Sequence, residues 1–349
     1  MTLPLPSLPP SSPTAATPLL VRFLLDAQDE FLRAIDHLPA PGRGGPLGRL
    51  NSAGWVVAHI ASVHDQWVNV LVGGRERDPW AAAWNDAQAA ATLAHPLPTP
   101  LAEARDAYRA IAARAAEVVA SMDAAALDRE VVTPRGTVTA GYLVARAPGH
   151  LFAHAGELAV MGALVTVPEL HLPGALPRVT STGVEASSEV EAGTDRPPRA
   201  VRLLLDAQSE FARAVEALPA PAAMGAIPRI HAGALTVAEV ANHEAGAWST
   251  ELRIWSGSAI TDRTAGQSVP SFDDARAAYL AAIEGSAANL EALRVDDLAR
   301  PMGDSTVGTQ IARSTGLLFA RAGELNALAS LFEAPDLGLP GALARTAER

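Results

Sequence analysis

The feature that most constrains the fold is an internal repeat. Residues 21–41, VRFLLDAQDEFLRAIDHLPAP, recur at 201–221 as VRLLLDAQSEFARAVEALPAP, with 15 of 21 positions identical. Two more pairs of similar segments follow in the same order along the chain: 102–110 with 273–281, and 151–164 with 317–331. Three matches in one order indicate that the chain holds one domain twice.

The repeat predicts how the chain is divided. We expect a disordered tail over 1–16, where prolines interrupt the sequence, a first domain over 17–170 and a second over 199–340. The stretch 171–198 is rich in Pro, Ser, Thr and Glu and lacks apolar periodicity. It is therefore predicted to be an exposed linker.

Within each repeat the apolar residues follow the period of an α-helix. The helices predicted for the first repeat cover 17–38, 52–73, 100–121 and 138–164. Strand patterns are scarce, and residues 129–139 are predicted to form at most a brief extended piece. The predicted fold class is all-α, with two tandem four-helix bundles.

Composition excludes several classes of function. The 349 residues include no cysteine, which excludes a disulfide framework, a zinc–thiolate site, an iron–sulfur cluster and a catalytic cysteine. The formal net charge of −11 argues against nucleic acid or an anionic membrane as the partner. No stretch approaches the ~20 apolar residues that span a bilayer. We expect a soluble, cytoplasmic protein that acts on a small molecule.

Histidines in the first repeat have the spacing of metal ligands. His150 and His154 are four residues apart on a predicted helix, so both imidazoles lie on one face. His59, on the helix predicted at 52–73, has apolar neighbours and is the third candidate ligand. His64 lies ~140° around that helix from His59 and is predicted to occupy a polar position beside the metal ligands.

The second repeat tests this interpretation from within the chain. Alignment places Glu239 at the position of His59, Leu317 at His150 and Arg321 at His154. The packing residues around them stay the same, as expected if the three histidines share one function. Glu239 and Arg321 are predicted to form an ion pair in the vacated site. The alternative is a residual metal site at His243.

Other polar residues of the first repeat are candidates for contact with a substrate. His64, Gln66 and Arg146 are the predicted catalytic residues, with Arg146 as an anchor for a carboxylate. Glu157 is a candidate acceptor for a ligand imidazole. Arg146 and Glu157 have counterparts in the second repeat, which lacks the histidines, so the structural interpretation of both is favoured.

The motifs GWVVAHIASVHDQW (54–67) and GHLFAHAGE (149–157) resemble the DinB-like superfamily. That superfamily includes mycothiol-dependent maleylpyruvate isomerases and the bacillithiol and mycothiol S-transferases. The resemblance implies a four-helix bundle that holds one divalent metal on His59, His150 and His154. It implies zinc first, with nickel, manganese and iron as alternatives.

The resemblance also implies a function. A low-molecular-weight thiol such as mycothiol would bind the metal as a thiolate and attack a small electrophile, giving a thiol S-transferase or a thiol-dependent isomerase. Two alternatives stay open: a metal-dependent hydrolase or lyase that activates water, and a non-enzymatic ligand-binding or stress-response bundle. Many DinB-like proteins are homodimers, which suggests either a monomer with an internal pseudo-dimer or a homodimer.

Overall fold

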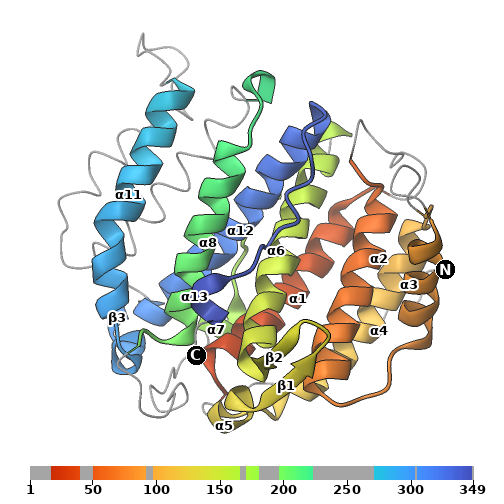
Figure 1. Cartoon of the computed structure of the whole chain (residues 1–349), viewed down its shortest axis with the longest axis horizontal. Helices are drawn as coiled ribbons and strands as arrows, with labels where there is room; N and C mark the ends of the chain where they lie inside the picture. Colours follow the sequence, from red (N-terminus) through yellow and green to blue (C-terminus); the bar gives the residue numbers. More distant parts are fainter. Residues whose placement is uncertain are drawn as a thin grey trace.

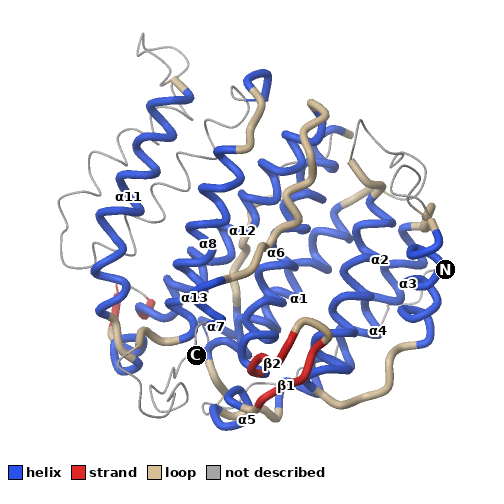
Figure 2. Tube along the Cα trace, in the orientation of Figure 1, coloured by secondary structure: helices blue, strands red, loops and turns tan. Residues whose placement is uncertain are grey.

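The computed structural model describes residues 17–39, 50–91, 97–165, 170–180, 196–222, 271–302 and 305–347. Helices make up most of this part of the chain (Figures 1 and 2). The predicted N-terminal tail, most of the predicted linker, and both Glu239 and His243 lie outside the described residues. The ion pair predicted for Glu239 and the residual site predicted for His243 therefore stay predictions.

The four helices predicted for the first half are present, three of them with ends within two residues of the predicted ones, whereas the helix predicted at 52–73 is an α-helix only as far as His64. They are α1 (Leu19–His37), α2 (Ala53–His64), α4 (Leu101–Ala120) and α6 (Ala140–Leu164). Ser52 caps α2 by accepting a hydrogen bond from the backbone N–H of Trp55, and Thr139 caps α6 in the same way. In Figure 1 the four helices lie side by side, with α6 on the side of the second half.

Four further elements complete the first half. A π-helix, η1 (Asp65–Val72), continues α2 without a break, and α3 (Pro79–Ala90) and α5 (Ala124–Asp128) fill connections between the long helices. The predicted extended piece is an antiparallel hairpin of β1 (Glu130–Thr133) and β2 (Gly136–Thr139). The hairpin brings the chain to the N-terminus of α6.

Long helices also form the second half, and three of them lie within the described residues. They are α8 (Arg199–Glu216), α11 (Phe272–Ala292) and α12 (Val307–Leu331). Its short elements are η3 (Ala220–Ala222), η4 (Val295–Ala299), β3 (Pro301–Met302), β4 (Ser305–Thr306) and α13 (Ala344–Ala347). None of the helices in the described ranges is long and apolar enough to cross a membrane.

The two halves meet where α6 crosses α12, and the contact is self-complementary. A Cβ on Gly156 would lie 1.9 Å from the carbonyl oxygen of Ala320, and a Cβ on Gly323 would lie 1.8 Å from that of Ala153. These four residues correspond pairwise at an offset of 167, so each contact occurs twice with the partners exchanged. That is the arrangement of a two-fold symmetric interface.

The prediction of an exposed linker is wrong for its first residues. Residues 170–180, here called the first strap, include α7 (Pro177–Thr180) and bury Leu172, Leu176 and Val179. The carboxylate of Asp26 on α1 accepts hydrogen bonds from the backbone N–H groups of Arg178 and Val179. The strap is therefore part of the packed structure rather than a spacer.

A corresponding segment closes the second half. Residues 336–347, here called the second strap, follow α12 and end in α13. The carboxylate of Asp206 on α8 accepts hydrogen bonds from the backbone N–H groups of Arg345 and Thr346, as Asp26 does in the first half. Figure 1 shows this segment running along α6, so the C-terminal end of the chain reaches the first half.

Candidate metal centre

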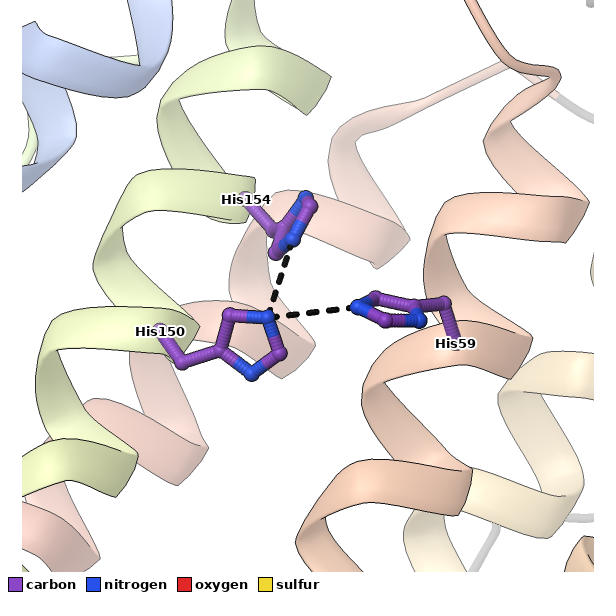
Figure 3. A group of neighbouring side chains, drawn as sticks. All are labelled: His59, His150 and His154. Carbon is purple, nitrogen blue, oxygen red and sulfur yellow. Dashed lines mark hydrogen bonds between the residues drawn. The ribbon is translucent and has the colours of Figure 1, made fainter. Parts of the chain in front are cut away.

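Three histidines from two helices of the first half converge on one point (Figure 3). The Nε2 atom of His150 lies 3.3 Å from that of His59 on α2 and 3.2 Å from that of His154, one turn further along α6. One nitrogen from each ring lies within 4.8 Å of the other two. Two ligand nitrogens bound to one ion in tetrahedral geometry are ~3.3 Å apart. The spacing therefore fits a shared metal ion.

The surroundings of His154 fix which of its nitrogens faces this point. Its Nδ1 lies 2.7 Å from a carboxylate oxygen of Glu157, so Nδ1–H donates to the carboxylate. The lone pair of Nε2 is then directed toward His59 and His150. A carboxylate on the outer nitrogen is the usual way in which proteins orient a metal-binding imidazole.

Burial favours the neutral form of two of these rings, those of His59 and His150. Burial lowers the pKa of His59 to about 3, the neighbouring His154 lowers it as well, and the charge of Asp336 opposes both effects. Burial also lowers the pKa of His150, and His154, His59 and Arg146 act in the same direction. A metal ligand must be a neutral imidazole, so these shifts prepare the site for a cation near neutral pH.

Aromatic rings hold the histidines in place. The indole of Trp55 stacks on His59 with 5.1 Å between ring centroids and 2° between the planes. Trp67 lies 5.2 Å from His150 between centroids, and the guanidinium of Arg146 sits over the same indole at 5.1 Å. These contacts leave little rotational freedom to the two imidazoles.

The three histidines line a pocket of about 280 Å³ that both halves of the chain enclose. Trp55, Trp67, Arg146 and Glu157 belong to the first-half wall. The second half contributes Gly323 and Asn326 of α12, together with Asp336 and residues 338–340 of the second strap. The volume is near the lower end of ~300–1,000 Å³ for small-molecule sites.

Residues 14–158 match the profile of the DinB superfamily. The first half of the chain carries a DinB superfamily domain. All three clustered histidines lie within the matched residues, whereas the second half lies outside them. Comparison with curated proteins and with solved structures gave no match.

The structure does not place His64 at the pocket of the DinB domain. Its ring is buried in the core, where Nε2 lies 2.7 Å from Nε2 of Gln28, and burial lowers its pKa to about 4. The predicted polar position beside the metal ligands is therefore corrected. The same angular separation from His59 that the sequence indicated directs His64 into the core instead.

Gln66 does not line the pocket either, because the helix changes its winding. The prediction assumed that an α-helix continues past His64, but residues 65–72 form a π-helix, which turns less per residue. The residue that faces His150 is consequently Trp67. The expected contact of Gln66 with substrate is corrected, since Trp67 and not Gln66 forms part of the pocket wall.

Arg146 lines the pocket, but its guanidinium is held by backbone. It donates hydrogen bonds to the carbonyl oxygens of Pro340, at 3.0 Å, and Gly341, at 2.5 Å. It also donates to the hydroxyl of Tyr142. Arg146 thus fastens the second strap to α6, and these contacts use three of the five N–H donors of its guanidinium.

In the second half, Arg321 and Glu324 stand where the DinB domain has His154 and Glu157. The guanidinium of Arg321 lies 2.7 Å from both carboxylate oxygens of Glu324. In both halves the glutamate carboxylate binds the side chain three positions earlier, His154 in the first half and Arg321 in the second. One partner of Arg321 is therefore on its own helix.

Sequence reasoning did not identify Asn326 and Asp336 as pocket residues. Both come from the second half of the chain. Repeated LPGAL at 172–176 and 339–343 marks the two straps in the sequence and would have located the second one.

Proposed function

We propose that the chain is a divalent-metal-dependent enzyme that uses a low-molecular-weight thiol, for S-transfer to a small electrophile or for its isomerisation. One observation carries this proposal: three imidazoles direct nitrogen atoms to one point on the wall of a pocket of about 280 Å³. Three protein ligands facing a pocket are typical of catalytic rather than structural metal sites, which use four.

His59, His150 and His154 would hold the metal, with zinc as the first choice and nickel, manganese or iron(II) as alternatives. The bound cation would lower the pKa of a thiol and so supply a thiolate near neutral pH. The chain has no cysteine, so the thiol must come from solution. We propose a mycothiol-like thiol because the two histidine motifs resemble those of the DinB-like superfamily, which includes mycothiol-dependent enzymes.

The chain's own residues prepare this chemistry. Glu157 keeps His154 in the tautomer that accepts a cation, and Trp55 and Trp67 form apolar walls that exclude water. Arg146 fixes the second strap as the opposite wall. Activation of water for hydrolysis has less support, because His64 and Asp65, two candidate acid–base groups, are buried in the core.

We also propose that the second half is a duplicated DinB-like domain that has lost the metal site. The recurring contacts at Asp26 and Asp206 and the exchanged contacts between α6 and α12 support this view. The two domains would then form an internal pseudo-dimer, and the chain would act as a monomer. Sedimentation of the purified chain at micromolar concentration tests the oligomeric state.

The function is tested with cobalt(II) as a spectroscopic substitute for the native metal. Adding 2-mercaptoethanol to the cobalt-loaded chain should produce a sulfur-to-cobalt absorption band in the near ultraviolet. With monochlorobimane present, the thiolate should form a C–S bond and displace chloride, which is followed by fluorescence. His59→Ala should abolish both signals, and His171→Ala, which changes an exposed histidine of the first strap, should change neither. A wild-type protein that binds cobalt but shows no band contradicts the thiol proposal.

A further inference from the structure

The second half places one carboxylate in the pocket, and its orientation is fixed. Oδ1 of Asp336 accepts hydrogen bonds from Nδ2 of Asn326, at 3.0 Å, and from the backbone N–H of Gly338, at 2.9 Å. Oδ1 of Asn326 in turn accepts from the backbone N–H of Leu337, at 3.0 Å. Both donors reach the same oxygen of Asp336, so this side chain cannot rotate without losing them.

The other oxygen of Asp336 is available to a ligand. Within the described part of the chain, no hydrogen bond joins Oδ2 to another residue, and Asp336 lines the same pocket as the three histidines. The charge of Asp336 also acts on His59. A carboxylate oxygen accepts hydrogen bonds and donates none when ionised.

The other charged groups of the pocket differ from Asp336. The carboxylate of Glu157 is bound to His154, and the guanidinium of Arg146 is bound to Pro340 and Gly341. Arg135, at the turn of the β1–β2 hairpin, also lines the pocket. Of the two acidic side chains that line the pocket among the described residues, Glu157 is bound to a histidine of the candidate metal centre, whereas Asp336 is held only by residues of the second half.

We propose that Asp336 is a specificity-determining residue that accepts a hydrogen bond from an ammonium or hydroxyl group of the ligand in the pocket. Asn326 is the positioning residue that directs Oδ2 of Asp336 toward that ligand. The second half, which has lost its own histidines, thereby selects the substrate for the metal centre of the first. This inference rests on the proposed thiol function and adds the chemical class of the thiol.

Three small thiols separate this contribution from binding at the metal. Cysteamine carries an ammonium group, 2-mercaptoethanol a hydroxyl group and ethanethiol neither, while all three offer the same sulfur. Their dissociation constants are measured on the cobalt-loaded full chain from the sulfur-to-cobalt band. Asp336→Asn keeps Oδ1 and its two hydrogen bonds but removes the negative charge, so the strap conformation is retained.

Asp336→Asn should weaken the binding of cysteamine about tenfold, because a hydrogen bond between two charged groups is lost. It should weaken the binding of 2-mercaptoethanol less, and it should change the dissociation constant of ethanethiol less than about twofold. Asn326→Ala should weaken the binding of cysteamine about threefold, because the carboxylate of Asp336 stays but loses its fixed orientation. Glu284→Gln, which removes one negative charge from an exposed position on α11, is the matched control and should change none of the three constants.

An equal loss of affinity for all three thiols in Asp336→Asn would overturn the inference and leave the thiol function standing. Unchanged affinity for cysteamine would overturn it in the same way. Failure of all three thiols to bind the cobalt-loaded wild-type chain would overturn the proposed function, and this inference with it.

Discussion

Helix α6 carries His150 and His154, whereas α12 places Leu317 and Arg321 at the corresponding positions. Both helices keep the glycine that lets them cross closely, and both keep a glutamate that holds the residue three positions earlier. Among the positions at which the two helices differ are the two that carry the pocket-facing histidines in the first half. The glycines of the helix crossing are thus kept where the candidate metal ligands are replaced, so the packing of the two helices and the candidate metal site depend on separate positions.

We expect the largest effect on stability from the glycines at which α6 and α12 cross. Gly156→Ala and Gly323→Ala should each lower the free energy of unfolding by about 3 kcal/mol, because the added methyl group overlaps a backbone carbonyl of the facing helix. Chemical denaturation measures both. Gly285→Ala, on α11 with nothing within 4 Å of the added atom, is the control and should be neutral or stabilising. A large difference between the first two variants would show that the crossing is not self-complementary.

The second prediction concerns the ion pair that stands in place of the metal ligand. Arg321→Ala should lower the free energy of unfolding by about 2 kcal/mol, because Glu324 is left buried without the charge that pairs with it. The metal content should not change. Loss of bound metal in this variant would mean that the second half takes part in the metal site.

The third prediction compares Glu157 on α6 with Glu324 on α12. Glu157→Gln should weaken metal binding about tenfold, because the carboxylate that orients His154 is lost. Competition with a chelator of known affinity measures the change. Glu324→Gln, the same change at the corresponding position of α12, should leave metal affinity as it is. Equal effects of both would refute the assignment of the metal to the first half.

The smallest effect is expected from His64, the histidine that the structure places in the core. Burial lowers its pKa to about 4, so between that value and ~6.5 the unfolded chain binds the proton more tightly, and stability falls as pH falls. From pH 7.5 to 5.5 this costs about 1.4 kcal/mol. The loss of stability over this interval should be smaller by that amount in His64→Gln. Identical pH profiles for the two proteins would contradict the assignment of His64 to the core.

The sequence indicated the long helices because their apolar period and caps are local. Ser52 caps α2 next to the predicted start of the helix, and the predicted extended piece is the β1–β2 hairpin. Helix α3 was missed although Asp78 and Pro79 are a common start signal, because the alanine-rich segment lacks a clear apolar stripe. The π-helix could not be predicted, since its hydrogen bonds do not follow from any local residue preference.

The candidate site likewise contains residues that the sequence predicts and residues that it does not. The approach of His59, His150 and His154 follows from helical spacing and the bundle fold, which one sequence can suggest. The position of Trp67 depends on the π-helix, and that of Asp336 on a strap that crosses between the two halves. Such contacts join residues that are far apart in the chain, and local patterns carry no information on them.

Elemental analysis of the purified chain without a histidine tag, beside a His59→Ala/His154→Ala double variant, tests the candidate metal centre. We expect about one divalent metal ion per wild-type chain and none in the variant. A wild-type chain that holds no metal after incubation with zinc, nickel, manganese and iron(II) would contradict it. The three histidines would then be structural residues of the bundle.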